Sequence, residues 1–187
     1  MTRLPPLDPE NLTPDQQAVY DAMRQGPRGD LGLVGPFGVW ARSPSVGNTI
    51  QQFGADMRFA TTSISETVKE VAICTVGAHF RAKFEFAAHR ALAMRAGVTE
   101  TVVDGIRAGN PEFNDADQAL AFAITRGLLD ENRINDERFN QAIDAWGENG
   151  LIELTSVIGY YCLVSLTLNV FEVPLSPGMA DPFPELP

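Results

Sequence analysis

Cysteine is scarce in this sequence, and its placement excludes the usual thiol-based scaffolds. The chain contains only Cys74 and Cys162, and no Cys-x-x-Cys motif occurs. A disulfide framework and a zinc site of the common spacing are therefore excluded. Cys74 follows Glu70 by four residues, which allows a thiol beside a carboxylate on one helical face. Because both cysteines lie in apolar segments, buried structural thiols are the more typical interpretation.

Basic residues are also few, and long apolar runs are missing. The chain has 14 Lys and Arg against 24 Asp and Glu, a net charge of −10 and a pI near 4.6. Such a chain is a poor partner for nucleic acid or for an anionic membrane. No uninterrupted apolar run reaches the ~20 residues that a membrane span needs, and residues 1–10 do not resemble a signal peptide. We expect a cytoplasmic protein that binds a small-molecule substrate and neither nucleic acid nor membrane.

Strand-like alternation and internal repeats are lacking as well. With 187 residues and 44% hydrophobic content, the chain is long enough for one domain with a substantial core. Its apolar residues recur at spacings of three and four, so the sequence predicts an all-α fold. We expect an N-terminal arm over residues 1–12, an all-α domain over 13–172 and a proline-rich C-terminal arm over 173–187.

Capping residues, prolines and glycines predict where the helices begin and end. They indicate helices over residues 14–24, 44–59, 66 to about 79, 83–95, 100–107, 115–131, 135–146 and 151–171. The last of these is apolar on nearly all sides, which predicts a central or interfacial helix.

Two segments near the N-terminus carry further expectations. Residues 26–38 are rich in glycine and proline but also apolar, which favours a lid or a subunit contact. In the helix over 44–59, the threes-and-fours spacing predicts a core role for four side chains, Val46, Ile50, Phe53 and Met57.

Histidine occurs only twice, at positions 79 and 89, and the second lies in an informative setting. Glu85 and His89 are one helical turn apart in an otherwise apolar segment, so they share a helix face. A carboxylate can raise the pKa of an imidazole and fix its tautomer, which suits general acid–base chemistry. Such pairs often face solvent, but the apolar surroundings favour a pocket. A hairpin of helices 66–79 and 83–95 would let Glu70 face the pair.

Taken in order, these residues resemble a known family. Glu70, the segment Glu85 to His89 (Glu-Phe-Ala-Ala-His), Gly97 with a Thr-capped helix after it, and the later Gly-Tyr-Tyr-Cys at 159–162 are similar to the carboxymuconolactone decarboxylase and alkylhydroperoxidase D-like family. The resemblance implies an all-α fold with a central helix hairpin. It also implies a homo-oligomer, trimer or hexamer, with pockets near subunit contacts.

The two branches of that family imply different chemistry. In the peroxidase branch, a glutamate matching Glu70 and a histidine matching His89 activate a Cys-x-x-Cys, whose two positions fall here on Ala82 and Glu85. An alkylhydroperoxidase or peroxiredoxin-type reaction would therefore lack both its nucleophile and its resolving thiol.

The decarboxylase branch keeps the Glu and His found here as Glu85 and His89. Its reaction, part of aromatic-compound breakdown, removes carbon dioxide from an unsaturated lactone acid through a dienolate and implies no cofactor or metal. On this hypothesis His89 protonates the intermediate, Glu85 orients and recharges His89, and Glu70 sets the local charge.

A substrate carboxylate needs a cation, and Arg81, Arg58 or Arg28 can supply one. Aromatic side chains that can wall the pocket are Phe37, Trp40 and Phe84. Two alternatives stay open. One is a metal site of Glu70, Glu85 and His89, joined or not by His79, and the other is a non-catalytic oligomeric ligand-binding protein.

Overall fold

The computed structural model describes residues 2–186, and these fold into eight helices without any strand. The helices are α1 (Pro14–Gln25), α2 (Pro36–Trp40), α3 (Pro44–Phe59), α4 (Glu66–His79), α5 (Lys83–Ala96), α6 (Glu100–Ala108), α7 (Ala116–Glu131) and α8 (Asp136–Val170). The predicted all-α class is confirmed. The segment over residues 26–38, predicted to be a lid or a subunit contact, leads into the short helix α2, which begins at Pro36 and ends at Trp40.

The predicted caps determine most helix ends. Thr13 begins α1 with a reciprocal capping box to Gln16, and Ser65 begins α4 by accepting a hydrogen bond from the Val68 amide. Helix α5 ends at Gly97, whose φ of 110° lies in the left-handed region that glycine adopts without a steric penalty. The helix hairpin of α4 and α5 is therefore set by local sequence.

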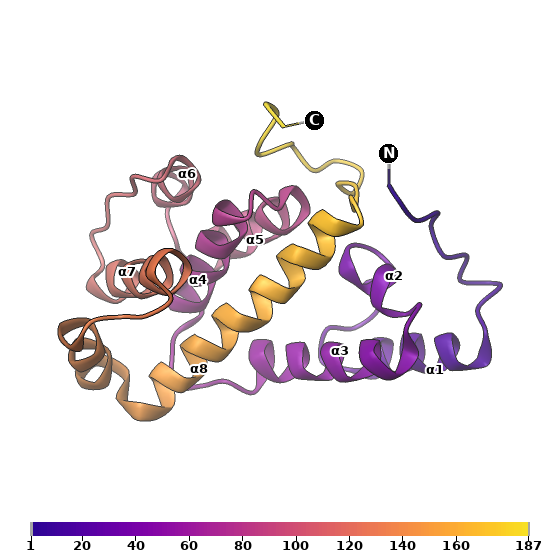
Figure 1. Cartoon of the computed structure of the whole chain (residues 1–187), viewed down its shortest axis with the longest axis horizontal. Helices are drawn as coiled ribbons and strands as arrows, with labels where there is room; N and C mark the ends of the chain where they lie inside the picture. Colours follow the sequence, from indigo (N-terminus) through magenta and orange to yellow (C-terminus); the bar gives the residue numbers. More distant parts are fainter. Residues whose placement is uncertain (1, 187) are drawn as a thin grey trace.

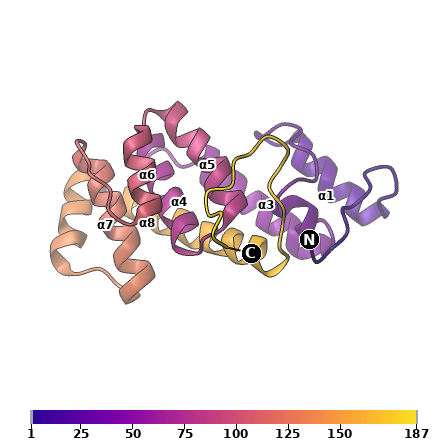
Figure 2. The same ribbon diagram turned by 90° about the horizontal axis from the view of Figure 1, so that it is seen from above.

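Helix α8 contains a kink that the sequence marks with glycine. The helices predicted over 135–146 and 151–171 are joined end to end, and Gly147 between them has φ 68°. After the kink, α8 runs as a long diagonal through the molecule, with α1–α3 on one side and α4–α7 on the other (Figure 1). Seen from above, the molecule is elongated, with α7 toward one end and α1 toward the other (Figure 2).

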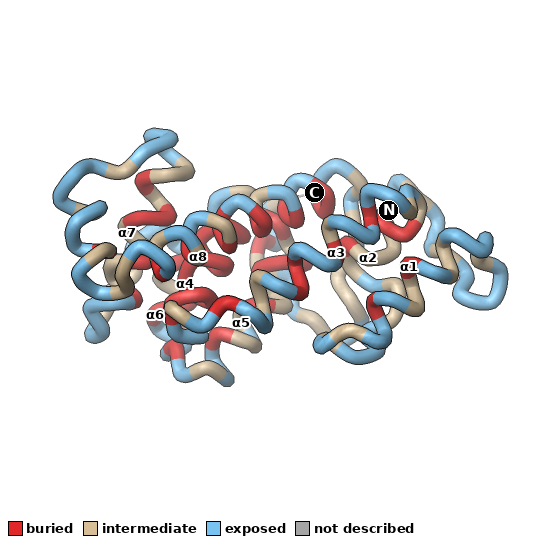
Figure 3. The backbone as a smooth tube through the Cα atoms, turned by 90° about the horizontal axis from the view of Figure 1, so that it is seen from below, coloured by how far each residue is buried: buried red, intermediate tan, exposed pale blue. Residues whose placement is uncertain are grey.

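Helix α4 is the centre of the core. It packs against α5, α6, α7 and α8, and it is buried along ten consecutive residues from Val68 to Gly77. The buried positions gather where α4, α5 and the second part of α8 meet (Figure 3). By length and composition alone α8 could cross a membrane, but 56% of its apolar window is buried in the protein, as in the central helix of a soluble domain.

The core assignment within α3 needs correction. Val46 and Phe53 are 55% and 42% exposed, whereas Ile50 and Met57 are half-buried against the core. Helix α3 packs through its glycines instead. A methyl group on Gly47 would lie 2.1 Å from the Trp40 carbonyl oxygen, so the close approach of α2 needs this residue type. The apolar spacing therefore predicted the helix but not the face that it buries.

The C-terminal segment after α8 has no regular structure within the described residues, but it is docked along α5. Phe183 is buried with its ring 5.4 Å from that of Phe86. Lys83 pairs with Asp181 at 2.9 Å. The predicted division into an arm over 1–12, a domain over 13–172 and an arm over 173–187 stays a prediction. The C-terminal arm nevertheless forms part of a cavity wall.

Candidate active site

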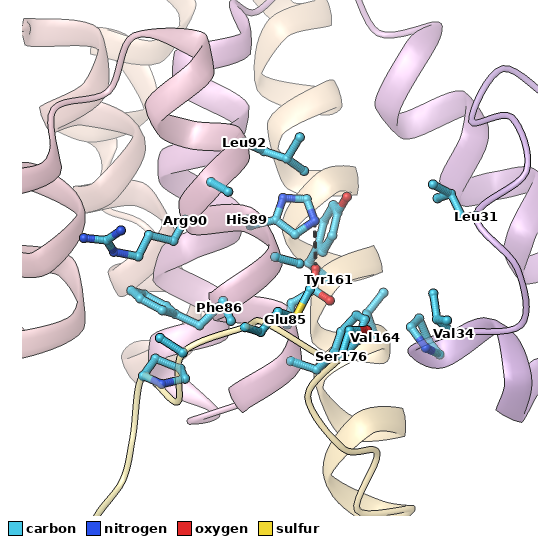
Figure 4. A pocket seen from close by; sticks show the side chains of 18 of the residues that line it. Leu31, Val34, Glu85, Phe86, His89, Arg90, Leu92, Tyr161, Val164 and Ser176 are labelled. Atoms are coloured by element: carbon cyan, nitrogen blue, oxygen red, sulfur yellow. Dashed lines mark ion pairs between the residues drawn. The ribbon is translucent and has the colours of Figure 1, made fainter. Parts of the chain in front are cut away.

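A cavity of about 1030 Å³ lies among α5, the second part of α8, the segment leading into α2, and the C-terminal arm (Figure 4). Most of its wall is apolar, including Leu31, Val34, Phe37, Phe59, Phe84 and Val164. A smaller set of polar side chains also lines it: Arg28, Arg58, Glu85, His89, Tyr160 and Tyr161. An apolar pocket with a few convergent polar groups is the usual form of a small-molecule site.

The α4–α5 hairpin brings the predicted Glu and His residues together. His89 Nδ1 lies 2.8 Å from Glu70 Oε2, in a buried hydrogen bond between the two helices. On its other side, His89 Nε2 lies 3.0 Å from Glu85 Oε1, one turn back along α5 (Figure 4). Glu70 is only 1% exposed and does not line the cavity, whereas Glu85 and His89 do. The imidazole is therefore held between two carboxylates at the cavity wall.

Arg58 of α3 completes the cluster by contacting the Glu70 carboxylate oxygen that His89 does not contact. Its Nη1 lies 2.8 Å from Glu70 Oε1, and its Nη2 lies 3.6 Å from Glu66 Oε2. Arg58, Glu70, His89 and Glu85 thus form a row of alternating charge whose sum is zero when His89 is protonated. Balanced charge of this kind is what makes a buried ionic cluster tolerable in a low-dielectric interior.

The cluster keeps His89 protonated. Burial alone lowers the pKa of a histidine, but the charges of Glu70 and Glu85, whose oxygens lie close to the two ring nitrogens, outweigh burial and raise the pKa of His89 to about 9. In Glu70, burial favours the neutral form, but His89 and Arg58 overcome that effect and lower its pKa. At neutral pH the site therefore holds an imidazolium between two carboxylates, which is a proton donor.

The two imidazolium protons are not held equally. Nδ1 makes a well-directed hydrogen bond with Glu70. The approach of Nε2 to Glu85 is close but poorly aligned, and Glu85 Oε1 is buried without a hydrogen-bond partner among residues 2–186. The Nε2 proton, on the side of the ring that faces Glu85, is consequently less firmly held by a hydrogen bond than the Nδ1 proton.

The raised pKa makes a prediction for folding. His89 has a pKa of about 9 in the folded protein, above its ordinary 6.5. Its protonation therefore stabilises the fold fully below pH 6.5, and this stabilisation is lost as pH rises through 9. The stabilisation amounts to about 3 kcal/mol. We expect the free energy of unfolding to decline between neutral pH and about pH 9 in wild type, and to decline less in His89→Gln. Urea unfolding across that range measures the difference, and parallel curves would contradict the protonated site.

Several solved structures are similar to this chain in overall fold. The debrominase Bmp8 in its apo form is 14% identical, with a TM-score of 0.71 over 92% of this chain and 91% of that one. An alkylhydroperoxidase AhpD core, an uncharacterized peroxidase-related protein from Ralstonia eutropha JMP134, is 13% identical, with a TM-score of 0.72 over 94% and 93%. The chain has the alkylhydroperoxidase D-like helical fold. The fold predicted from the sequence resemblance is thereby confirmed.

A third structure with the alkylhydroperoxidase D-like fold holds a ligand. It is a variant of the Bmp8 debrominase with a cysteine changed to alanine, in complex with 2,3,4-tribromopyrrole, and it is 14% identical with a TM-score of 0.73 over 95% and 93%. No protein-family model and no curated protein sequence matches the chain. At these identities the likeness establishes the fold.

Within this alkylhydroperoxidase D-like fold, three of the five predicted substrate-binding residues line the cavity: Arg58, Phe37 and Phe84. The other two lie elsewhere, and their assignment is withdrawn. Arg81 belongs to the turn before α5 and pairs with Glu185 of the C-terminal arm. Trp40 is 5% exposed in the core, where its indole N–H donates to Thr167 at 3.4 Å.

Two tyrosines of α8 belong to the site but were not predicted as site residues. The Tyr161 ring meets His89 edge-on, with the ring centroids 4.9 Å apart, and the Tyr160 ring lies 5.1 Å from Tyr161. Burial raises the pKa of both hydroxyls, so both are neutral donors at physiological pH. The sequence signals were the Tyr-Tyr pair in a largely apolar helix and its place in the Gly-Tyr-Tyr-Cys segment that carries the family resemblance.

The residues that only the competing hypotheses invoke, His79 and the two cysteines, lie outside the cavity. His79 is 3.6 Å from Asp130 of α7 and does not approach the cluster. Within residues 2–186 no group of three or more His, Cys, Asp or Glu is arranged to hold a metal ion. Cys74 is fully buried, and burial is the main cause that raises the pKa of its thiol. Neither Cys74 nor Cys162 lines the cavity.

Proposed function

We propose that this protein is a cofactor-free lyase that decarboxylates a small unsaturated lactone acid or keto acid by acid–base chemistry of His89 and Glu85. The observation that carries the proposal is the position of His89, protonated between two carboxylates at the wall of a largely apolar cavity. A pKa of about 9 supplies a proton donor at neutral pH, as protonation of a carbanion requires.

The proposed reaction needs no external oxidant, reductant or electron sink. The bond between the substrate carbon and its ionised carboxylate breaks and carbon dioxide leaves. The electron pair moves into the conjugated carbonyl, which forms a dienolate. His89 Nε2–H then forms the new C–H bond, the pair returns from the enolate oxygen, and neutral His89 regains its proton from solvent.

Each member of the cluster has a part in that step. Glu70 accepts from Nδ1 and fixes the ring, so that Nε2 is the atom presented beside Glu85. Glu85 lines the cavity and stabilises the imidazolium, which favours recovery of the proton after transfer. Arg58 keeps Glu70 ionised through its 2.8 Å contact. The neutral hydroxyl of Tyr161 supplies a donor for the enolate oxygen next to His89.

A solved structure of similar fold supports the expected size of the substrate. The complex of the debrominase variant with 2,3,4-tribromopyrrole is a case in which a protein of this fold binds a small planar five-membered ring. An unsaturated five-membered lactone is a ring of the same size. This likeness supports the substrate class and not the reaction.

A thiol peroxidase or related thiol enzyme is the competing proposal, and thiol chemistry separates the two. We expect Cys74→Ser and Cys162→Ser, alone and together, to leave lyase turnover unchanged, because neither cysteine lines the cavity. The assay is ultraviolet absorbance with a panel of unsaturated lactone acids and β-keto acids, with organic hydroperoxide consumption measured in parallel. Peroxide consumption that depends on Cys74 would overturn the lyase proposal. Silence in both assays would favour a ligand-binding protein.

We further propose that the protein acts in the cytoplasm as a trimer or hexamer. Apolar side chains on the outward face of α8 support self-association, since Ile152, Leu163 and Leu166 are 63%, 40% and 49% exposed. Light scattering of the purified protein measures its mass in solution, and a monomer would contradict the assembly.

A further inference from the structure

We propose that Arg28 and the Tyr160 hydroxyl form a binding site for a second carboxylate, one that the substrate keeps throughout the reaction. The ligand class is then a small planar acid whose retained carboxylate lies away from the reacting carbon. That the substrate keeps this carboxylate through the reaction rests on the proposed function. The binding of the carboxylate itself does not depend on turnover.

Arg28 is held in place by neutral groups. Its Nη1 donates to the Gln51 carbonyl oxygen at 3.0 Å. Its guanidinium carbon lies 5.6 Å from the ring centre of Phe37 and 5.9 Å from that of Phe59, which are stacking distances for a cation on aromatic rings. These contacts fix the position and the plane of the guanidinium while leaving its charge without a carboxylate partner.

The other arginines of the cavity differ from Arg28 in this respect. Arg58 and Arg90 are each paired with two carboxylates. Arg95 and Arg107 are exposed at the surface. Among the described residues that line the cavity, Arg28 is thus the guanidinium that is both fixed by packing and without an acidic partner within 4.0 Å. A planar, preorganised guanidinium of this kind suits bidentate carboxylate binding.

The Tyr160 hydroxyl and the Arg28 guanidinium lie next to the same residue of α3, Gly54. A methyl group added to Gly54 would lie 2.0 Å from the Tyr160 hydroxyl oxygen and 2.8 Å from Arg28 Nη2. The glycine therefore makes room for both groups side by side. The Tyr160 ring is wedged edge-on against Phe53 at 5.7 Å, so its hydroxyl is as fixed as the guanidinium. A neutral hydroxyl beside a guanidinium offers three donors to one carboxylate.

Charge balance indicates that the ligand is an anion. The cluster around His89 sums to zero, since Arg58 and His89 offset Glu70 and Glu85. Arg28 adds one positive charge beside this cluster, and the retained carboxylate of the ligand offsets it. From Tyr160 to Tyr161 to His89 the ring centres step by 5.1 Å and 4.9 Å. The proposed ligand, a single small ring with acidic groups at opposite ends, would lie along these two steps.

Binding of matched probes tests the site without any turnover. Benzoate and benzamide have the same shape and differ in charge. By calorimetry we expect benzoate to bind wild type more tightly than benzamide does. Arg28→Gln should weaken benzoate about 10- to 100-fold, as expected for a lost hydrogen bond to a charged group, and leave benzamide unchanged. Arg95→Gln, at an exposed position on the same cavity, should retain the benzoate preference.

Gly54→Ala gives an independent variant with a favourable helix residue in place of glycine. Its methyl group displaces both Arg28 and Tyr160, so we expect it to lose the benzoate preference with the helical circular dichroism retained. Equal binding of the two probes to wild type, no binding of benzoate, or a preference that survives Arg28→Gln would each overturn the site.

The two proposals can fail separately. If no lactone acid or keto acid turns over but benzoate binding depends on Arg28, the anion site stands and the lyase proposal falls. If turnover depends on His89 but Arg28→Gln leaves KM unchanged, the anion site alone falls.

Discussion

Replacing His89 by glutamine is expected to lower kcat for the lactone acid by about 10² to 10⁴. Glutamine keeps much of the size and hydrogen bonding of histidine, but its amide N–H is far too weak an acid to protonate a carbanion. The loss should appear in kcat rather than KM, because the imidazolium acts on the dienolate and not on the bound acid. Steady-state kinetics by ultraviolet absorbance measures the effect on the substrate that the panel identifies.

The second histidine provides the matched control. His79 is exposed and pairs with Asp130 away from the cavity, so His79→Gln should keep wild-type turnover. In wild type, kcat should fall as pH rises through about 9, because the acid form of His89 is lost there. A rate that rises over that range would indicate that His89 acts as a base, and full activity in His89→Gln would remove it from the reaction.

Arg58→Met is expected to lower the free energy of unfolding by about 3 to 5 kcal/mol, the usual cost of breaking a buried ion pair from one side. The methionine fills much of the space of the arginine stem but leaves Glu70, 1% exposed, with only His89 to offset its charge. Urea unfolding at neutral pH measures the loss. Activity should also drop, because Glu70 ionises less readily without Arg58 and only the ionised carboxylate holds the imidazole in place.

An exposed pair tests whether burial is the cause. Arg126 lies 2.7 Å from Asp130 with both side chains about two-fifths exposed, so Arg126→Met should cost less than about 1 kcal/mol. The double variant Arg58→Met with Glu70→Gln should recover part of the stability, because no unpaired carboxylate is left behind. Equal small losses at Arg58 and Arg126 would mean that the buried cluster contributes little.

The parts of the site that local sequence specifies were predictable. Glu85 and His89 are one turn apart on a single helix, and the caps at Ser65 and Gly97 bound the hairpin that carries them. The contact of Glu70 with His89 follows once α4 and α5 lie antiparallel and close. Each of these steps depends on spacing within about thirty residues, where helical geometry leaves few alternatives.

The parts that depend on distant contacts were not predictable. Arg58 and Arg81 look alike in sequence, yet one contacts Glu70 and the other the C-terminal arm. Similarly, the spacing of Val46 and Phe53 identifies an apolar helix face without showing whether anything covers it. The position of Arg28 against α3 and α8 requires packing between segments more than twenty residues apart, which no local pattern encodes.

The burial of α4 places the two ends of the site in different surroundings. Glu70 belongs to the innermost helix, where backbone amides exchange with solvent only on large-scale unfolding. Arg28 belongs to a short, glycine-rich segment outside the helices, with Gly29 and Gly32 at positive φ. A change in that segment can alter ligand binding while Glu70, the carboxylate that orients the proton donor, stays buried in the core. Selectivity for the ligand can therefore drift in evolution at little cost to the reacting group.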